Sequence, residues 1–103
     1  MRFTSLLGFA LVTAGVACAP KNEVFISTKD AFNPPRLPVQ QGVTVTWVND
    51  DTVAHTVIGT TDPETWDSGT LDPGGRFDHL FNSAGTFAYI CPRHGERGTV
   101  VVQ

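Results

Sequence analysis

Residues 86–101, TFAYICPRHGERGTVV, contain an apolar strand, a short turn and a second strand rich in valine. The turn carries Cys91 and His94, with two residues between them. A thiolate and an imidazole at this spacing can face one ion but cannot complete its coordination, so distant residues must supply the other ligands. The alternative interpretation is a buried cysteine beside a surface histidine. A second histidine upstream would favour the metal site.

The N-terminal residues differ in composition from the rest of the 103-residue chain. Residues 3–17 carry no charge and follow Arg2, which predicts a secretory signal over residues 1–17. A retained membrane anchor would need about 20 apolar residues, and Pro20 and Lys21 interrupt this run too early. The signal predicts an exported protein, which we expect in a bacterial periplasm.

Two interpretations of the end of this signal stay open. Cys18 could be the lipid-bearing first residue of a bacterial lipoprotein, although such signals usually carry leucine where Gly15 stands. Cleavage after Ala14 would instead leave an unpaired exported thiol. A lipid anchor at Cys18 is therefore one of two alternatives, and we expect the folded domain to occupy residues 23–103.

Cysteine usage and charge limit the classes of function. Cys91 is expected to be unpaired, because the only other cysteine, Cys18, lies in or beside the signal. An idle exported thiol is prone to oxidation, which favours a thiolate occupied by a metal. Without Arg2 the chain carries six Lys and Arg against ten Asp and Glu, a net charge of −4. This balance argues against nucleic acid or an anionic membrane as partner.

Downstream of Glu23 the sequence predicts a small all-β domain. In the clearest strand, Val43, Val45 and Trp47 alternate with threonines. Residues 59–64 are polar and predict a loop. Turn signals recur about every 8–12 residues and no amphipathic stretch of helical length is present. We therefore expect seven or eight short strands in an antiparallel sandwich with Greek-key connections, a Greek-key β-sandwich.

His55 follows the polar turn at residues 49–52 and stands at the predicted start of a strand. From there its side chain can meet the turn at 91–94, so that two imidazoles and one thiolate converge. This donor set suits copper in both oxidation states and predicts an electron-transfer site. Zinc also binds such donors, but copper binds them more tightly. His79 shares a strand face with two phenylalanines and is expected to pack there rather than bind metal.

Several short motifs occur in a defined order along the chain. They are Val43-Thr-Val-Thr-Trp-Val-Asn49, His55-Thr-Val57, Ser68-Gly69-Thr-Leu71, Pro73-Gly74, Gly85-Thr-Phe87, Cys91-x-x-His94 and Gly98-Thr-Val-Val101. In this order they resemble the small type 1 copper proteins of the cupredoxin family, such as plastocyanin and amicyanin, over residues 23–103. The resemblance implies a Greek-key β-sandwich with copper at its loop-rich end. It also implies that His55, Cys91 and His94 are the copper ligands.

The chain departs from the family at the axial copper ligand. Relatives usually carry methionine after the ligand turn, whereas residues 94–98 read HGERG and the only methionine is Met1. Glu96 could replace the missing sulfur, but Arg97 could not, because it is a cation without an acceptor atom. If the shortened turn points Glu96 at solvent, the site is three-coordinate or takes the backbone carbonyl of Ala54.

Three functions are consistent with such a site. We favour a one-electron carrier that serves redox protein partners, because rigid ligands let copper change oxidation state without rearrangement. Copper capture or delivery in copper tolerance is the alternative, which an under-coordinated site would favour. An enzyme-like copper with an open position for a small ligand is the third. No Ser-His-Asp set, P-loop or paired carboxylate indicates catalysis, so we do not expect an enzyme. We also expect the protein to be a monomer.

Overall fold

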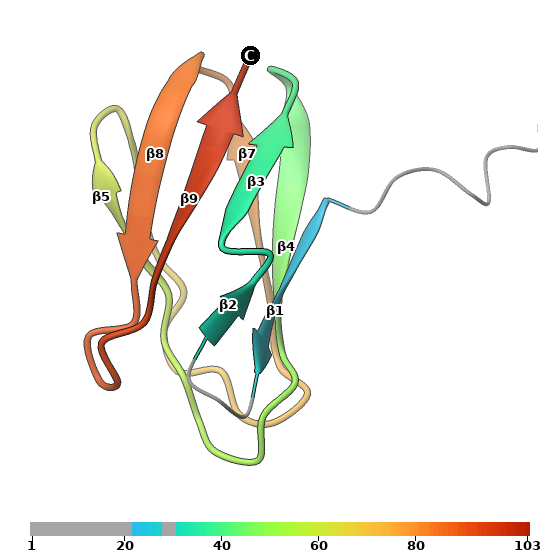
Figure 1. Cartoon of the computed structure of the whole chain (residues 1–103), viewed down its shortest axis with the longest axis vertical. Helices are drawn as coiled ribbons and strands as arrows, with labels where there is room; N and C mark the ends of the chain where they lie inside the picture. The colour runs from blue at the N-terminus through green and yellow to red at the C-terminus, as the bar shows by residue number, and fades with distance from the viewer. Residues whose placement is uncertain (1–21, 28–30) are drawn as a thin grey trace, which may run out of the picture.

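The computed structural model describes residues 22–27 and 31–103, which form two β-sheets packed face to face (Figure 1). Their nine strands are β1 (Glu23–Ser27), β2 (Ala31–Asn33), β3 (Arg36–Val39), β4 (Val43–Asn49), β5 (Ile58–Thr61), β6 (Glu64–Asp67), β7 (Arg76–Phe81), β8 (Gly85–Ile90) and β9 (Arg97–Val102). The predicted all-β sandwich is confirmed. In this part of the chain no helix is long and apolar enough to cross a membrane. The predicted signal over residues 1–17 and Cys18 lie outside the described residues.

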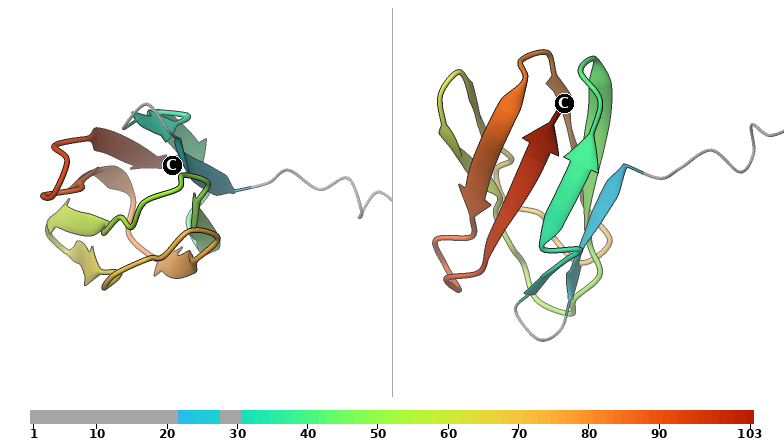
Figure 2. Two further views of the ribbon diagram at one scale, coloured as in Figure 1. Left: turned by 90° about the horizontal axis from the view of Figure 1, so that it is seen from below. Right: turned by 45° about the horizontal axis from the view of Figure 1, so that its top comes forward.

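The first sheet has the strand order β2-β1-β4-β7 and the second has the order β3-β9-β8-β5-β6. Seen end-on in Figure 2, the two sheets enclose a common interior. All neighbouring strands run antiparallel except the pairs β1–β4 and β3–β9, which are parallel. The parallel pairs arise because the chain leaves the first sheet after β2 and enters the second at β3. Pro34 and Pro35 stand at this crossing, and the two short strands beside them raise the strand count above the predicted seven or eight.

The polar residues 59–64 predict a loop, and this prediction is wrong except at residues 62 and 63, which form the turn of a hairpin. Strands β5 and β6 pair as an antiparallel hairpin, with Gly59 opposite Trp66. The Trp66 ring covers Gly59 so closely that a Cβ at this position would collide with it. The two threonines of β5 bond the backbone of Ala88 in β8, one donating at 3.3 Å and one accepting at 3.1 Å. Glycine and threonine therefore serve packing and strand contact here, not a turn.

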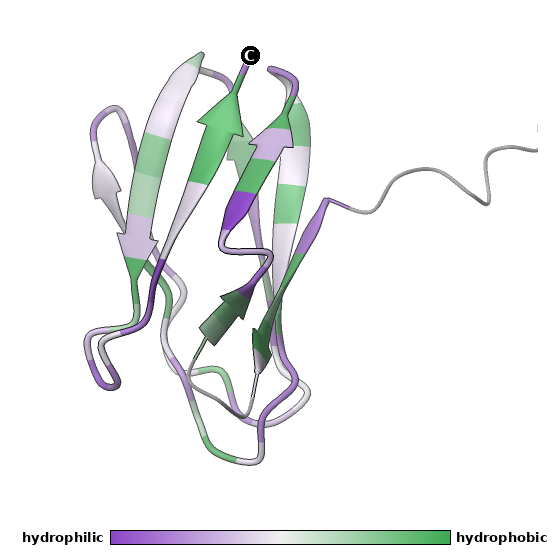
Figure 3. Ribbon diagram, viewed as in Figure 1, coloured by the Kyte–Doolittle hydropathy of each residue, from purple (hydrophilic) through white to green (hydrophobic). Residues whose placement is uncertain are grey.

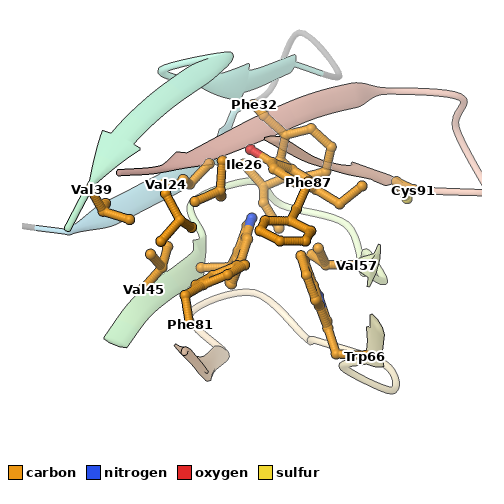
Figure 4. Close-up of a cluster of buried hydrophobic side chains, with 14 of the residues drawn as sticks. Val24, Ile26, Phe32, Val39, Val45, Val57, Trp66, Phe81, Phe87 and Cys91 are labelled. Carbon is orange, nitrogen blue, oxygen red and sulfur yellow. The ribbon is translucent and has the colours of Figure 1, made fainter. Parts of the chain in front are cut away.

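Trp47 of β4 lies fully buried at the centre of the core. Apolar and polar residues alternate along β4 (Figure 3), so this strand turns its apolar face inward. The Trp47 ring lies 5.0 Å from Trp66 and 5.2 Å from Tyr89, and two phenylalanine rings of β7 lie 6.1 and 6.4 Å away. These separations are those of stabilising aromatic pairs. Figure 4 shows the cluster, with Cys91 at its edge.

Glu64, the first residue of β6, is buried although it is acidic. Its Oε2 accepts hydrogen bonds from the backbone N–H groups of Asn82 at 3.0 Å and Ser83 at 2.9 Å, and its Oε1 lies 2.8 Å from His79 Nε2. Burial acts to raise the pKa of Glu64, but these hydrogen bonds outweigh it and hold the pKa below its usual value. The carboxylate thus ties the β5–β6 hairpin to the turn between β7 and β8.

Replacement of this carboxylate, Glu64→Gln, is expected to destabilise the protein by about 1–3 kcal/mol near neutral pH, because one amide oxygen must serve three donors. The folded-state pKa is lowered, so the contribution is full above the unfolded-state pKa and is lost as pH falls through the folded-state pKa. Urea unfolding across this acidic range measures the difference from wild type. Glu23→Gln, in an exposed pair with Arg76, is the control and should cost under about 1 kcal/mol. A Glu64→Gln penalty that does not shrink with falling pH would contradict this account.

The connections between strands gather the candidate site at one end of the sandwich. The β4–β5 connection, the β6–β7 connection and the turn from β8 to β9 all lie at the end opposite the C-terminus (Figure 1). His55 lies three residues before β5, where the isolated bridge His55–Leu71 joins the first two of these connections. The predicted strand that begins at His55 therefore starts later, at Ile58.

Candidate metal centre

Four side chains bring possible metal donors together at this end of the sandwich. They are His55, Cys91, His94 and Glu96, whose donor atoms all lie within 4.8 Å of one another. Cys91 Sγ lies 3.9 Å from His55 Nδ1 and 3.7 Å from His94 Nδ1. The two Nδ1 atoms are 3.1 Å apart. The structure thus brings together all four residues that the sequence singles out as candidates.

The four donors differ in their access to solvent. His55 and Cys91 are completely buried and Glu96 is 5% exposed. The side chain of His94 is 25% exposed and forms the outer side of the cluster. The three buried residues would therefore shield an ion held by these atoms from water. The exposed His94 ring would connect the ion to the protein surface.

The turn from β8 to β9 is closed by its own backbone, which places three of the four donors. The Cys91 N–H donates to Glu96 O at 2.9 Å, and the N–H groups of His94 and Gly95 donate to Cys91 O at 3.3 and 2.7 Å. Gly95 has φ of +83°, a conformation that glycine adopts without strain. The chain reverses there, and Glu96 points back at the cluster. The short turn therefore directs Glu96 toward the cluster and not toward solvent.

The buried Glu96 carboxylate fits a site that binds a cation. Oε2 lies 3.1 Å from His55 Nδ1 and Oε1 lies 3.8 Å from His94 Nδ1. Both oxygens are buried without a hydrogen bond among the described residues, because the neighbouring imidazoles pair with the carboxylate only when protonated. A buried carboxylate without partners is costly, whereas a bound cation would satisfy it. The donor set of two nitrogens, one sulfur and one oxygen fits a copper ion.

Both the backbone and the imidazole ring of His55 are held in place by polar contacts. Its backbone N–H donates to Leu71 O at 3.0 Å and its carbonyl accepts from the Leu71 N–H at 2.7 Å. On the side of the ring away from the cluster, Nε2 lies 2.8 Å from Asp51 Oδ2. The hydrogen bond with His55, followed by that from the Thr52 N–H, holds the pKa of Asp51 below its usual value. Asp51 is therefore a carboxylate at neutral pH.

Asp51 and Asn49 are the site residues that the sequence analysis missed, because residues 49–52 predict only a turn. Asn49 is buried, and its Nδ2 donates to the carbonyls of Val53 and Leu71, each at 2.8 Å. An Asn/Asp-rich turn just before a candidate ligand was the available signal. His79, by contrast, contacts Glu64 and stacks on a tryptophan, and it is not a member of the donor cluster.

The comparison with protein families agrees with this geometry. Residues 21–103 match the family model described as copper binding proteins of the plastocyanin/azurin family. The chain belongs to this family. Its cofactor is therefore copper, and the His55, Cys91 and His94 donors fit a type 1 site.

Known relatives of this cupredoxin include a plastocyanin of Scenedesmus fuscus, 32% identical over 84 residues that cover 70% of this chain and 86% of the relative. Among solved structures, a purple cupredoxin from Nitrosopumilus maritimus is 29% identical with a TM-score of 0.72, covering 79% of this chain and 98% of that one. A copper(I) form of an amicyanin variant is 30% identical with a TM-score of 0.72, covering 79% and 80%. The predicted cupredoxin-like fold is confirmed.

Proposed function

We propose that this cupredoxin carries single electrons between redox proteins through one copper ion held by His55, Cys91, His94 and Glu96. The observation that carries the proposal is the assembled donor cluster, with donor atoms within 4.8 Å of one another. Bound copper supplies a one-electron couple between Cu(II) and Cu(I). Cupredoxins of the plastocyanin and amicyanin kind are electron carriers and not enzymes.

The protein's own residues keep the donors in place. Cys91 and Glu96 are tied to each other through their backbones, and His55 is tied to Leu71 across the neighbouring connection. Each of these anchors belongs to the backbone framework of the sandwich, so the donors have little freedom to move. Little movement between oxidation states means a small rearrangement cost for each electron transferred.

His94 is the proposed route of the electron to the surface. It is the one exposed member of the cluster, whereas the other three are buried. A redox partner that contacts the exposed edge of this imidazole would approach the ion without entering the protein. We place the partner's docking site there.

The experiment that tests the function is reconstitution with Cu(II), followed by repeated chemical reduction and reoxidation. We expect an intense visible absorption from the thiolate, lost and recovered over many cycles with one copper retained per chain. Azide added to the oxidised protein should leave the spectrum unchanged, because four protein donors would hold the ion. Copper that leaves the protein on reduction, or that binds azide, would overturn the proposal.

Copper delivery is the competing function, and it was favoured by a site with too few donors. Glu96 turns inward and adds a buried oxygen donor, so the site does not have the shortage of donors that would favour copper delivery. Transfer of copper from the reduced protein to a metal-free acceptor within seconds would support delivery. Retention of copper under the same conditions would support electron transfer.

Export remains part of this proposal, since the chain begins with an uncharged apolar run after Arg2. Expression in a bacterium and the mass of the recovered protein test it. Loss of the first 17 residues with a diacylglyceryl group on Cys18 would indicate a lipid anchor, and loss of the signal without added mass would indicate a free periplasmic protein. An intact N-terminus in the cytoplasm would contradict export.

A further inference from the structure

Asp51 lies directly behind His55, on the side of the imidazole that faces away from the donor cluster. Asp51 is 9% exposed and His55 is completely buried. Oδ2 of Asp51 lies 2.8 Å from His55 Nε2, and Oδ1 accepts a hydrogen bond from the Thr52 N–H at 2.6 Å. Both carboxylate oxygens therefore have a polar contact, and one of these contacts is with a residue of the candidate metal centre.

The carboxylate is held at this place by its neighbour in the turn. Asn49 Oδ1 accepts from the Asp51 N–H at 2.9 Å, while Asn49 Nδ2 donates to Leu71 O at 2.8 Å. Leu71 is also the residue that pairs with His55 through the backbone. The network therefore fixes Asp51 and His55 to the same segment, so the distance between them does not depend on a flexible loop.

We infer that Asp51 is a positioning residue that selects the tautomer of His55 and biases the copper toward its oxidised state; the inference rests on the proposed function. An ionised carboxylate can only accept hydrogen bonds, so Asp51, at 2.8 Å, holds a proton on Nε2, while the carboxylate that faces Nδ1, Glu96 at 3.1 Å, belongs to the donor cluster itself. Nδ1 then carries the lone pair, and Nδ1 is the atom that faces Cys91 and His94. A carboxylate behind a ligating histidine also makes that histidine a stronger donor.

The charge of Asp51 acts in the same direction as the charges of the donors. The Cys91 thiolate and the Glu96 and Asp51 carboxylates place three negative charges around the site, more than the two positive charges of Cu(II). Reduction to Cu(I) adds a further electron to an environment that is already anionic. The oxidised ion is therefore favoured, and the reduction potential falls.

The chain offers a matched control for this charge. Asp50 precedes Asp51 directly and is exposed, whereas Asp51 is buried against His55. Asp50→Asn and Asp51→Asn each remove one formal negative charge from the same turn. Only the second variant removes a carboxylate that contacts the imidazole, so a difference between the two variants isolates that contact from the general field of the protein.

The experiment measures the Cu(II) and Cu(I) affinities and the reduction potential of the copper-loaded protein and both variants. We expect Asp51→Asn to weaken Cu(II) binding about 10–100-fold and Cu(I) binding less. The potential should rise by about 59 mV for each tenfold difference between the two effects. Asp50→Asn should stay close to wild type. Equal potentials in the two variants would overturn the inference.

A second measurement needs no variant. Nitrogen-15 NMR of the wild-type protein, metal-free and with Cu(I), reports which ring nitrogen of His55 carries the proton. We expect a proton on Nε2 in both forms, protected from exchange by Asp51. A proton on Nδ1 and none on Nε2 in the metal-free protein would overturn the tautomer assignment even if copper binds. Absence of thiolate absorption in copper-treated wild type would instead refute the proposed function and leave this NMR result to decide the role of Asp51.

Discussion

Cys91→Ser is expected to abolish the intense visible absorption of the Cu(II) protein while leaving the sandwich folded. That absorption arises from charge transfer between a thiolate and Cu(II), and Cys91 is the only cysteine among the described residues. A serine hydroxyl occupies almost the same space, and it is a much weaker ligand for copper at neutral pH. Titration with Cu(II), followed in the visible range, measures the effect.

Two controls separate loss of the ligand from loss of the fold. Near-ultraviolet circular dichroism of the metal-free variant should match wild type, because the aromatic core around Trp47 does not depend on the sulfur. His79→Gln changes a histidine outside the donor cluster and should keep the absorption, whereas His94→Gln should weaken or shift it. An unchanged spectrum in Cys91→Ser would refute the assignment of this residue as the thiolate ligand.

The fold class was predictable because hydrophobic alternation is a local signal. In β4 every second residue is buried, from Val45 through Trp47 to Asn49, and the pattern of side chains along the sequence reports this directly. The β5–β6 hairpin was not predictable in the same way. Gly59 stands in a strand because a tryptophan ring from the facing residue needs its space, and that requirement is not visible along the chain.

The candidate site shows the same division between local and long-range information. Cys91 and His94 share one turn, and the motif order along the chain points to His55 as the distant partner. The role of Asp51 was not predictable, because it depends on how the His55 ring is oriented. Only the folded β4–β5 connection brings Nε2 of that ring to 2.8 Å from Asp51 Oδ2. The direction of Glu96 depends likewise on the positive φ of one glycine. Turns that carry ligands are decided by backbone geometry, which composition does not report.

Glu96→Gln is expected to act in opposite directions on the metal-free and the copper-loaded protein. In the metal-free protein no cation offsets the buried Glu96 carboxylate, whose close polar neighbours are the imidazoles of His55 and His94, and a buried charge without hydrogen bonds destabilises the fold. A neutral amide of the same shape reduces that penalty. We expect the metal-free variant to gain about 1–3 kcal/mol in free energy of unfolding, which for a domain of this size raises Tm by roughly 5 °C or more.

In the copper-loaded protein the same substitution removes a negative charge that offsets the charge of Cu(II). The oxidised ion loses more than the reduced ion, so the reduction potential should rise, and the increase in Tm on adding Cu(II) should shrink, because that increase follows the affinity of the native state for the ion. Thermal unfolding with and without copper, together with redox titration, measures both effects. Asp78→Asn, an exposed acidic position on β7, controls for the loss of one charge from the surface, where salt screens its effect on the ion. If Glu96→Gln leaves the potential where Asp78→Asn leaves it, Glu96 does not bind the copper. If the metal-free variant melts below wild type, the carboxylate stabilises the metal-free fold through its contact with the His55 imidazole 3.1 Å away, and its burial does not indicate a cation site.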